Sequence, residues 1–69
     1  MVRNRIRELR FIADGMTQQR LAEQIGVSRQ TVNAIEGGKY SPSLEVAFRI
    51  AHALERPIEE VFEYRGRRR

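Results

Sequence analysis

Residues 17–40 read TQQRLAEQIGVSRQTVNAIEGGKY, and this stretch predicts two short helices joined by a tight turn. Thr17 and Ser28 each carry a side-chain oxygen that can accept a hydrogen bond from a free N–H in the first turn of a helix, so each marks a helix start. Gly26 lies between them and can adopt the positive φ with which the first helix ends. That first helix has an apolar side, because apolar residues recur at helical spacing: Leu21, Ala22 and Ile25.

The second helix of the pair is predicted to have one apolar face and one polar face. Val32 and Ile35 are its apolar positions, and a different face carries Arg29, Gln30 and Asn33. In the major groove of DNA, Arg can donate two hydrogen bonds to guanine, and Gln or Asn can pair with adenine through two hydrogen bonds. Contact with base edges is therefore the preferred interpretation of these three side chains, and a solvated face is the alternative.

A helix before this pair is predicted over residues 4–13, with an end near Asp14 and Gly15. Apolar residues recur in it at a helical spacing, and two more widen the apolar face: Ile6, Leu9 and Ala13, with Phe11 and Ile12 beside them. After the pair, residues 37–42 contain too much Gly and Pro for a continued helix and predict a loop.

The last third of the chain predicts two more helices and a strand. Ser43 is placed to cap a helix that extends to about Glu55 and buries a broad face made of Leu44, Ala47, Phe48, Ala51 and Leu54. Pro57 suits the first turn of a short fifth helix that carries Ile58 and Val61. Residues 61–64, VFEY, then alternate bulky residues with a charge, which is a strand signal on a segment that needs a partner.

The ordered run TQQ–LA–IGVSRQTV–IEGGKYSPS resembles the Cro/phage-repressor family of DNA-binding domains, and the resemblance covers nearly the whole chain. It implies an all-α, five-helix fold like that of lambda repressor, in which helices two and three form the helix-turn-helix. Residues 1–64 also resemble the short cytolysin-operon repressors of this family, which pair a C-terminal strand with N-terminal residues, here 2–4. A small helical bundle with a solvated polar face is the alternative.

The resemblance and the helix positions together suggest further roles. The family joins Arg10 and Glu36 in a salt bridge, and a surface location for either residue is the alternative. Ser28 is predicted to cap its helix and to touch a thymine methyl group. A helix amino end attracts phosphate, and position next to the recognition helix favours the same role; the predicted phosphate contacts are Thr17, Gln18, Gln19, Thr31, Lys39 and Tyr40. Tyr40 could instead pack against Pro42.

Composition indicates one small basic domain that associates with a polyanion and with a second copy of itself. The 69 residues include 13 Lys and Arg against 9 Asp and Glu, a net charge of +4. A hydrophobic core alone is barely sufficient at this length, so dimerisation is expected through C-terminal residues, namely Ile58, Val61, Phe62 and Tyr64. Residues 1–64 are assigned to the domain, and residues 65–69, RGRRR, to a basic tail that is disordered in isolation.

Several classes of function are excluded or disfavoured. The absence of cysteine rules out disulfides and thiolate metal sites, and His52 has no second histidine nearby. Glu59, Glu60 and Glu63 form an acidic cluster without a nucleophile, so it is expected to face water. No apolar run of 18 residues and no signal-peptide pattern is present, which predicts a soluble, cytoplasmic protein without membrane contact. An enzyme, a cofactor and a small-molecule ligand are not expected.

The sequence therefore predicts a DNA-binding transcriptional regulator, a repressor by analogy with most of the family. It would bind a pseudo-palindromic operator in double-stranded DNA as a homodimer, through the major groove. The alternative from another class is a protein-interaction module, such as an antitoxin or an assembly partner, whose DNA binding is mainly non-specific.

Overall fold

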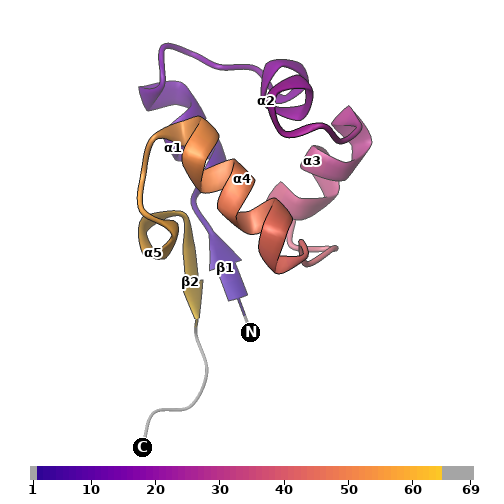
Figure 1. The fold of residues 1–69 in the computed structure, drawn as a ribbon, viewed down its shortest axis with the longest axis vertical. Coiled ribbons are helices and arrows are strands. Elements are labelled where there is room, and N and C mark those ends of the chain that lie inside the picture. Colours follow the sequence, from indigo (N-terminus) through magenta and orange to yellow (C-terminus); the bar gives the residue numbers. More distant parts are fainter. Residues whose placement is uncertain (1, 65–69) are drawn as a thin grey trace, which may run out of the picture.

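In the computed structural model of the protein, which describes residues 2–64, five helices surround one core and a two-stranded sheet joins the ends of the chain (Figure 1). The elements follow one another as β1 (Val2–Asn4), α1 (Ile6–Ile12), α2 (Gln18–Ile25), α3 (Arg29–Glu36), α4 (Leu44–Leu54), α5 (Ile58–Val61) and β2 (Phe62–Tyr64). The predicted five-helix fold with a terminal β pairing is confirmed. The basic tail, residues 65–69, lies outside the described residues.

Local hydrogen bonds define the α2–α3 pair as the sequence predicted. The Thr17 hydroxyl accepts from the backbone N–H of Arg20 at 3.0 Å, and the Ser28 hydroxyl accepts from the N–H of Thr31 at 3.1 Å. Gly26 closes α2 with a φ of 78°, a left-handed conformation that costs glycine little. The two helices pack against each other across this turn (Figure 1), so the position of α3 depends on that of α2.

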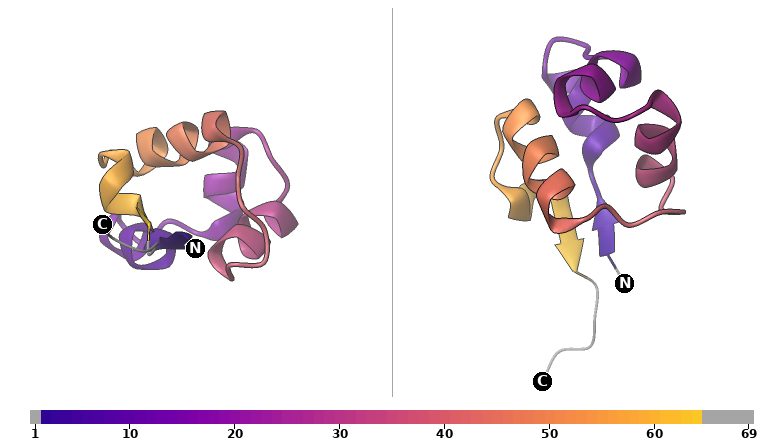
Figure 2. Two further views of the ribbon diagram at one scale, coloured as in Figure 1. Left: turned by 90° about the horizontal axis from the view of Figure 1, so that it is seen from below. Right: turned by 45° about the vertical axis from the view of Figure 1, so that its right-hand side comes forward.

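One hydrophobic core receives side chains from all five helices. Figure 2 shows the helices arranged around a common centre, which these side chains fill. The buried cluster consists of Ile6, Leu9, Leu21, Ala22, Ile25, Val32, Ile35, Ile50, Ala51, Leu54 and Val61. Because α3 contributes to this core through Val32 and Ile35, the face that carries Arg29, Gln30 and Asn33 stays exposed to solvent.

The predicted apolar faces of α1 and α4 were partly wrong. Four residues assigned to them are more than half exposed: Phe11, Ile12, Leu44 and Phe48. The side of α4 that is buried consists of Ala47, Ile50, Ala51 and Leu54, at helical spacings of three, four and seven residues. Each residue turns the helix by about 100°, so Phe48 points away from the side that Ala47 occupies. Ile50, which the prediction omitted, is 1% exposed.

The first helix begins later in the chain than predicted, because its predicted first residue, Asn4, belongs to the strand β1. β1 and β2 are antiparallel, with Val2 opposite Tyr64, Arg3 opposite Glu63 and Asn4 opposite Phe62, so the predicted pairing is confirmed. The carbonyl oxygen of the Asn4 side chain accepts from the N–H of Ile6 at 3.1 Å, which explains why α1 begins at Ile6 rather than at Asn4. The Asn4 amide also donates to the backbone oxygen of Ile35 at 2.9 Å and so ties the sheet to the end of α3.

Candidate nucleic-acid interface

The outer face of α3 presents three polar side chains to solvent. Arg29, Gln30 and Asn33 are exposed, whereas Val32 and Ile35 on the opposite side are each 1% exposed. The Ser28 and Thr31 hydroxyls lie 2.9 Å apart at the start of the helix and share a hydrogen bond. Thr31 is half-buried, and Ser28 is exposed. The exposed face of α3 therefore displays two amides and one guanidinium, while its opposite face is anchored in the core.

The amino end of α2 lies beside this face. A hollow in the surface between the two helices is lined by Gln18, Gln19, Arg29, Gln30 and Asn33. A neighbouring hollow is lined by Arg10, Thr17, Gln18, Gln19 and Arg29. The fold thus brings the residues that the sequence assigned to α2 and the first half of α3 together, although they come from two helices.

Lys39 and Tyr40 lie at the other end of α3, in the loop that follows it. Both side chains are exposed, and that of Tyr40 is 54% exposed. Tyr40 also lines a small hollow with Pro42 and with Asn4 and Phe62 of the two strands. The proposed packing of Tyr40 near Pro42 is therefore compatible with an exposed ring, and the two loop residues stand apart from the α2–α3 hollow.

A buried ion pair fixes the carboxyl end of α3. Arg10 Nε donates to Glu36 Oε2 at 2.6 Å, and Arg10 Nη2 donates to Glu36 Oε1 at 3.0 Å. The side chains of the two residues are 11% and 8% exposed. Arg10 Nη1 also donates to the backbone oxygen of Met16 at 2.8 Å, in the loop before α2. One guanidinium therefore joins α1, that loop and α3, and both charged groups are satisfied by hydrogen bonds.

Gln18 connects this ion pair to the outer face of α3. Its Nε2 donates to Glu36 Oε1 and to Asn33 Oδ1, each at 3.2 Å. By contrast, the amide of the adjacent Gln19 donates to Glu23 on its own helix at 3.1 Å. The sequence analysis singled out Gln18, Asn33 and Glu36 but did not indicate the link between them, because Gln18 lies 15 and 18 residues before its two partners.

A family model described as helix-turn-helix matches residues 6–61. The chain belongs to the helix-turn-helix family. An HTH-type transcriptional regulator from Methanothermobacter thermautotrophicus is 59% identical over 49 residues, which are 70% of this chain and 71% of the relative. The restriction-modification controller protein C.AhdI from Aeromonas hydrophila is similar in structure, with a TM-score of 0.72, 36% identity and coverage of 80% of this chain and 82% of C.AhdI. A crystal structure of a Bacteroides fragilis protein gives a TM-score of 0.80 at 28% identity and covers 91% of this chain and all of that one.

Membership of the helix-turn-helix family confirms the predicted resemblance to the Cro/phage-repressor type and the non-enzymatic class. Like its relatives, the chain is a transcriptional regulator of the DNA-binding kind. Among residues 2–64, no group of acidic or histidine side chains is arranged to hold a metal ion, and none of the helices has the length and hydropathy to cross a membrane. His52 is exposed on α4, and Glu60 lies 3.4 Å from Arg56.

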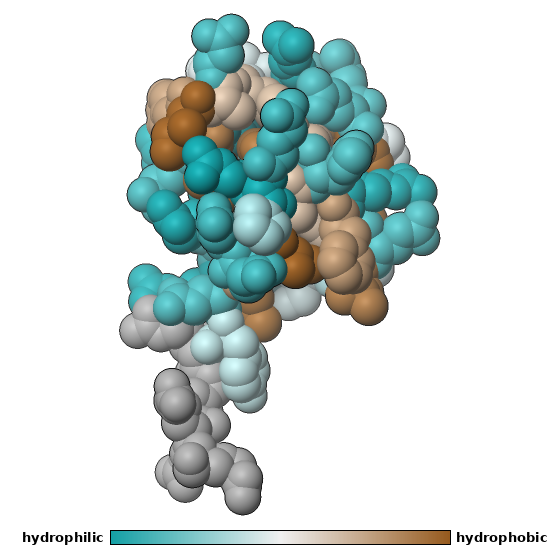
Figure 3. Space-filling view, turned by 60° about the vertical axis from the view of Figure 1, so that its left-hand side comes forward, coloured by the Kyte–Doolittle hydropathy of each residue, from teal (hydrophilic) through white to brown (hydrophobic). Residues whose placement is uncertain are grey.

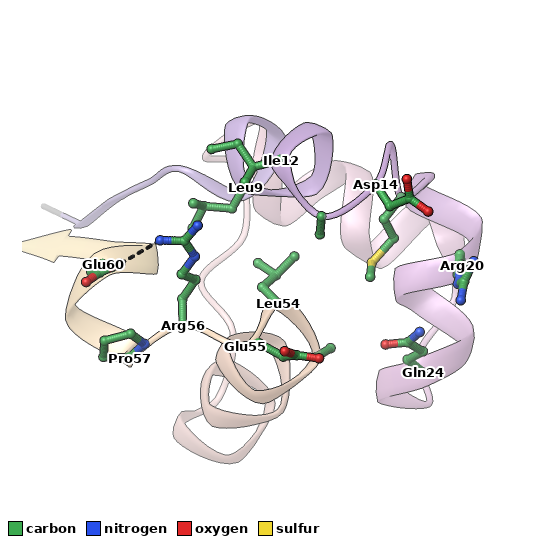
Figure 4. Close-up of a pocket in the computed structure, with 13 residues that line it drawn as sticks. Leu9, Ile12, Asp14, Arg20, Gln24, Leu54, Glu55, Arg56, Pro57 and Glu60 are labelled. Atoms are coloured by element: carbon green, nitrogen blue, oxygen red, sulfur yellow. Dashed lines mark hydrogen bonds and ion pairs between the residues drawn. The ribbon is translucent and has the colours of Figure 1, made fainter.

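A surface pocket of this helix-turn-helix domain lies between the α1–α2 side and the α4–α5 side (Figure 4). Its floor is apolar, with Leu9 and Leu54, and its rim carries both signs of charge, including Asp14, Arg20 and Glu55. None of the thirteen residues that line it belongs to the predicted DNA contacts. It is a separate feature of the fold.

The residues predicted to form a dimer interface differ in accessibility. Tyr64 is 73% exposed, whereas Ile58 and Phe62 are half-buried and pack against the core. Val61 is fully buried in the single chain, so its assignment to the interface was wrong: the side chain belongs to the core. Val2, opposite Tyr64 in the sheet, is 51% exposed. On the face that Figure 3 shows, hydrophobic residues gather in separate areas among hydrophilic ones.

Proposed function

We propose that the protein is a sequence-specific transcriptional repressor that binds a pseudo-palindromic operator as a homodimer, with α3 in the major groove of each half-site. The observation that carries this proposal is the division of α3 into two faces. Val32 and Ile35 anchor it in the core, while the side chains that suit base edges, Arg29, Gln30 and Asn33, all lie on its solvent side. A helix of this kind can enter the groove without disturbing the fold.

Groups suited to phosphate flank α3 at both ends. The first N–H groups of α2, at Gln18 and Gln19, have no partner within the helix, and both residues line a surface hollow with Thr17 and Arg29. Lys39 and Tyr40 follow its end, with Thr31 in its first turn. Contacts of this type fix the register of the protein on DNA without reading sequence. The amino end of α2 and the loop after α3 would therefore hold α3 between the two DNA phosphate backbones that border one major groove.

Replacing Arg29 or Gln30 with alanine should weaken operator binding by about 1–3 kcal/mol for each variant and leave non-specific binding nearly unchanged. Both side chains are exposed, so the fold should tolerate the change. Titration of operator and unrelated duplexes measures the difference. Arg20→Ala is the matched control, because it removes one exposed positive charge from α2 at the pocket away from this face. Equal losses on both duplexes would reassign Arg29 and Gln30 to the backbone.

Lys39→Ala should behave differently, with the same loss of affinity on every duplex. The exposed Lys39 stands beyond α3, where it suits a phosphate rather than a base. Each lost phosphate contact lowers the slope of log K against log salt concentration by about 1. Titrations at several salt concentrations measure this slope, and an unchanged slope would refute the phosphate role.

Selection of bound sequences from a random pool of duplexes tests the proposed function directly. A repressor of this design should enrich two inverted half-sites whose centres are about one helical turn apart. If the protein instead serves mainly to bind another protein, the pool should show no common sequence. Enrichment of one unpaired half-site would contradict the two-fold arrangement.

A further inference from the structure

The amide of Gln18 lies between a buried carboxylate and an exposed amide of the recognition helix. Its Nε2 is 3.2 Å from Glu36 Oε1 and 3.2 Å from Asn33 Oδ1. Glu36 has a side chain that is 8% exposed and is held by two hydrogen bonds from Arg10. The carboxylate therefore cannot turn away, and it presents a fixed acceptor to Gln18.

The chemistry of these groups sets the direction of the two hydrogen bonds that Gln18 forms, one with Glu36 and one with Asn33. An ionised carboxylate only accepts hydrogen bonds, so the part of the Gln18 amide that faces Glu36 must be its NH2 group. That group has two hydrogens: one reaches Glu36, and the other reaches Asn33. Asn33 must accept it through Oδ1, and this leaves the NH2 group of Asn33 as the part of its amide that is not engaged by α2.

We propose that Gln18 is a positioning residue that makes Asn33 a hydrogen-bond donor toward the base edge. This inference rests on the proposed function and concerns specificity within that site. Guanine presents two adjacent acceptors in the major groove, O6 and N7, whereas cytosine presents only the N4 donor there. An amide that offers NH2 outward should therefore favour guanine at the base that Asn33 faces, instead of the two-bond pairing with adenine that a freely rotating asparagine forms.

The orientations of the other two side chains on this face, Arg29 and Gln30, are not fixed by neighbouring residues in the same way. Within residues 2–64, the side chains of Arg29 and Gln30 form no hydrogen bond to the protein, whereas Asn33 is held by Gln18. Arg29 and Gln30 can adapt to their bases when DNA binds. In the proposed arrangement, Asn33 fixes one position of the operator in advance, and Gln18 leaves its own backbone N–H for phosphate.

The test measures the affinity of the full chain for four operator duplexes that differ only at the base pair read by Asn33. That base pair is identified as the one at which Asn33→Ala loses discrimination. The wild type should bind the guanine duplex about tenfold or more tightly than the cytosine duplex, the scale of one good base contact. Gln18→Ala should reduce this ratio to about threefold or less, because the Asn33 amide can then rotate. The affinity for the adenine duplex should rise relative to the affinity for the guanine duplex.

Two further variants separate positioning from other roles. Gln19→Ala is the matched control: Gln19 follows Gln18 on α2, but its amide is bonded to Glu23 rather than to α3. It keeps the backbone N–H proposed for phosphate and should leave the ratio of affinities among the four duplexes unchanged. Asn33→Asp keeps the size of the side chain and replaces its NH2 group with an acceptor, so it should reverse the preference from guanine toward cytosine. Thermal melting confirms that each variant is folded.

The possible results distinguish this inference from the proposed function. Enrichment of an operator together with a guanine preference that Gln18→Ala abolishes supports both. A wild type that prefers adenine, an Asn33→Ala variant that changes no base preference, or a Gln18→Ala variant that loses affinity uniformly overturns the positioning role alone. Absence of any sequence preference overturns the proposed function and the inference with it.

Discussion

Replacing Arg10 with alanine is expected to lower the free energy of unfolding by about 3–5 kcal/mol, because it leaves the Glu36 carboxylate buried without its partner. The Glu36 side chain is 8% exposed, and both of its oxygens accept from the guanidinium. A domain of this class has a total stability of about 5–15 kcal/mol, so the loss is a large part of it. Urea denaturation followed by circular dichroism measures the change.

Two comparison variants show whether the cost comes from the unpaired charge. Arg10→Met combined with Glu36→Leu removes both charges and should recover much of the stability, since apolar pairs of similar volume often replace buried ion pairs at little cost. Glu8→Ala removes the exposed ion pair between Arg5 and Glu8 at the start of α1, whose side chains are 49% and 65% exposed, and should cost less than about 1 kcal/mol. If Arg10→Ala cost no more than Glu8→Ala, Glu36 would be reaching water in the variant.

The features that were predictable from sequence depend on neighbouring residues. A hydroxyl at Thr17, Ser28 or Ser43 bonds an N–H three residues later, so a short window contains the whole interaction. Gly26 likewise ends α2 through its own backbone angle. Because these signals occur in a fixed order, the helix-turn-helix could be located without any knowledge of distant contacts.

The side of a helix that is buried depends on what packs against it, and sequence alone does not supply that. Leu44 lies in the first turn of α4 and is 71% exposed, although its spacing from Ala47 suits a buried position. Phe11 at the end of the short helix α1 is 65% exposed. Hydrophobic spacing identified both helices correctly but assigned these side chains to the core, where the surrounding elements leave no place for them.

The same distinction applies to the site. The types and spacing of Arg29, Gln30 and Asn33 indicate base contact, because one helix carries them all. The orientation of the Asn33 amide depends on Gln18 and Glu36, which only the folded chain brings within 3.2 Å of each other. A list of candidate residues was therefore available from sequence, whereas the direction of their hydrogen bonds required the structure.

The second large effect concerns dimerisation. Tyr64 is 73% exposed at the end of β2, and its partner in the sheet, Val2, is 51% exposed, so an apolar surface remains at the paired termini of a single chain. A two-fold axis through this surface would give a self-complementary contact between two copies. Phe62 packs against the core, and a charge there would disturb the fold as well as an interface. Tyr64 is the better site for a test.

Tyr64→Glu should therefore give a folded monomer by sedimentation and reduce operator affinity by about 100-fold or more, although no proposed DNA contact has changed. Two-fold pairing would place the recognition helices about 34 Å apart, one turn of B-DNA, so that the second helix binds at the high effective concentration set by the first. Phe11→Glu is the control, because it adds the same charge at another exposed aromatic residue, on α1, and should leave the dimer intact. If the Tyr64→Glu protein still sediments as a dimer, the dimer interface lies elsewhere on the molecule. A wild type that is monomeric at micromolar concentration and binds one half-site tightly would show that a single α3 supplies the affinity.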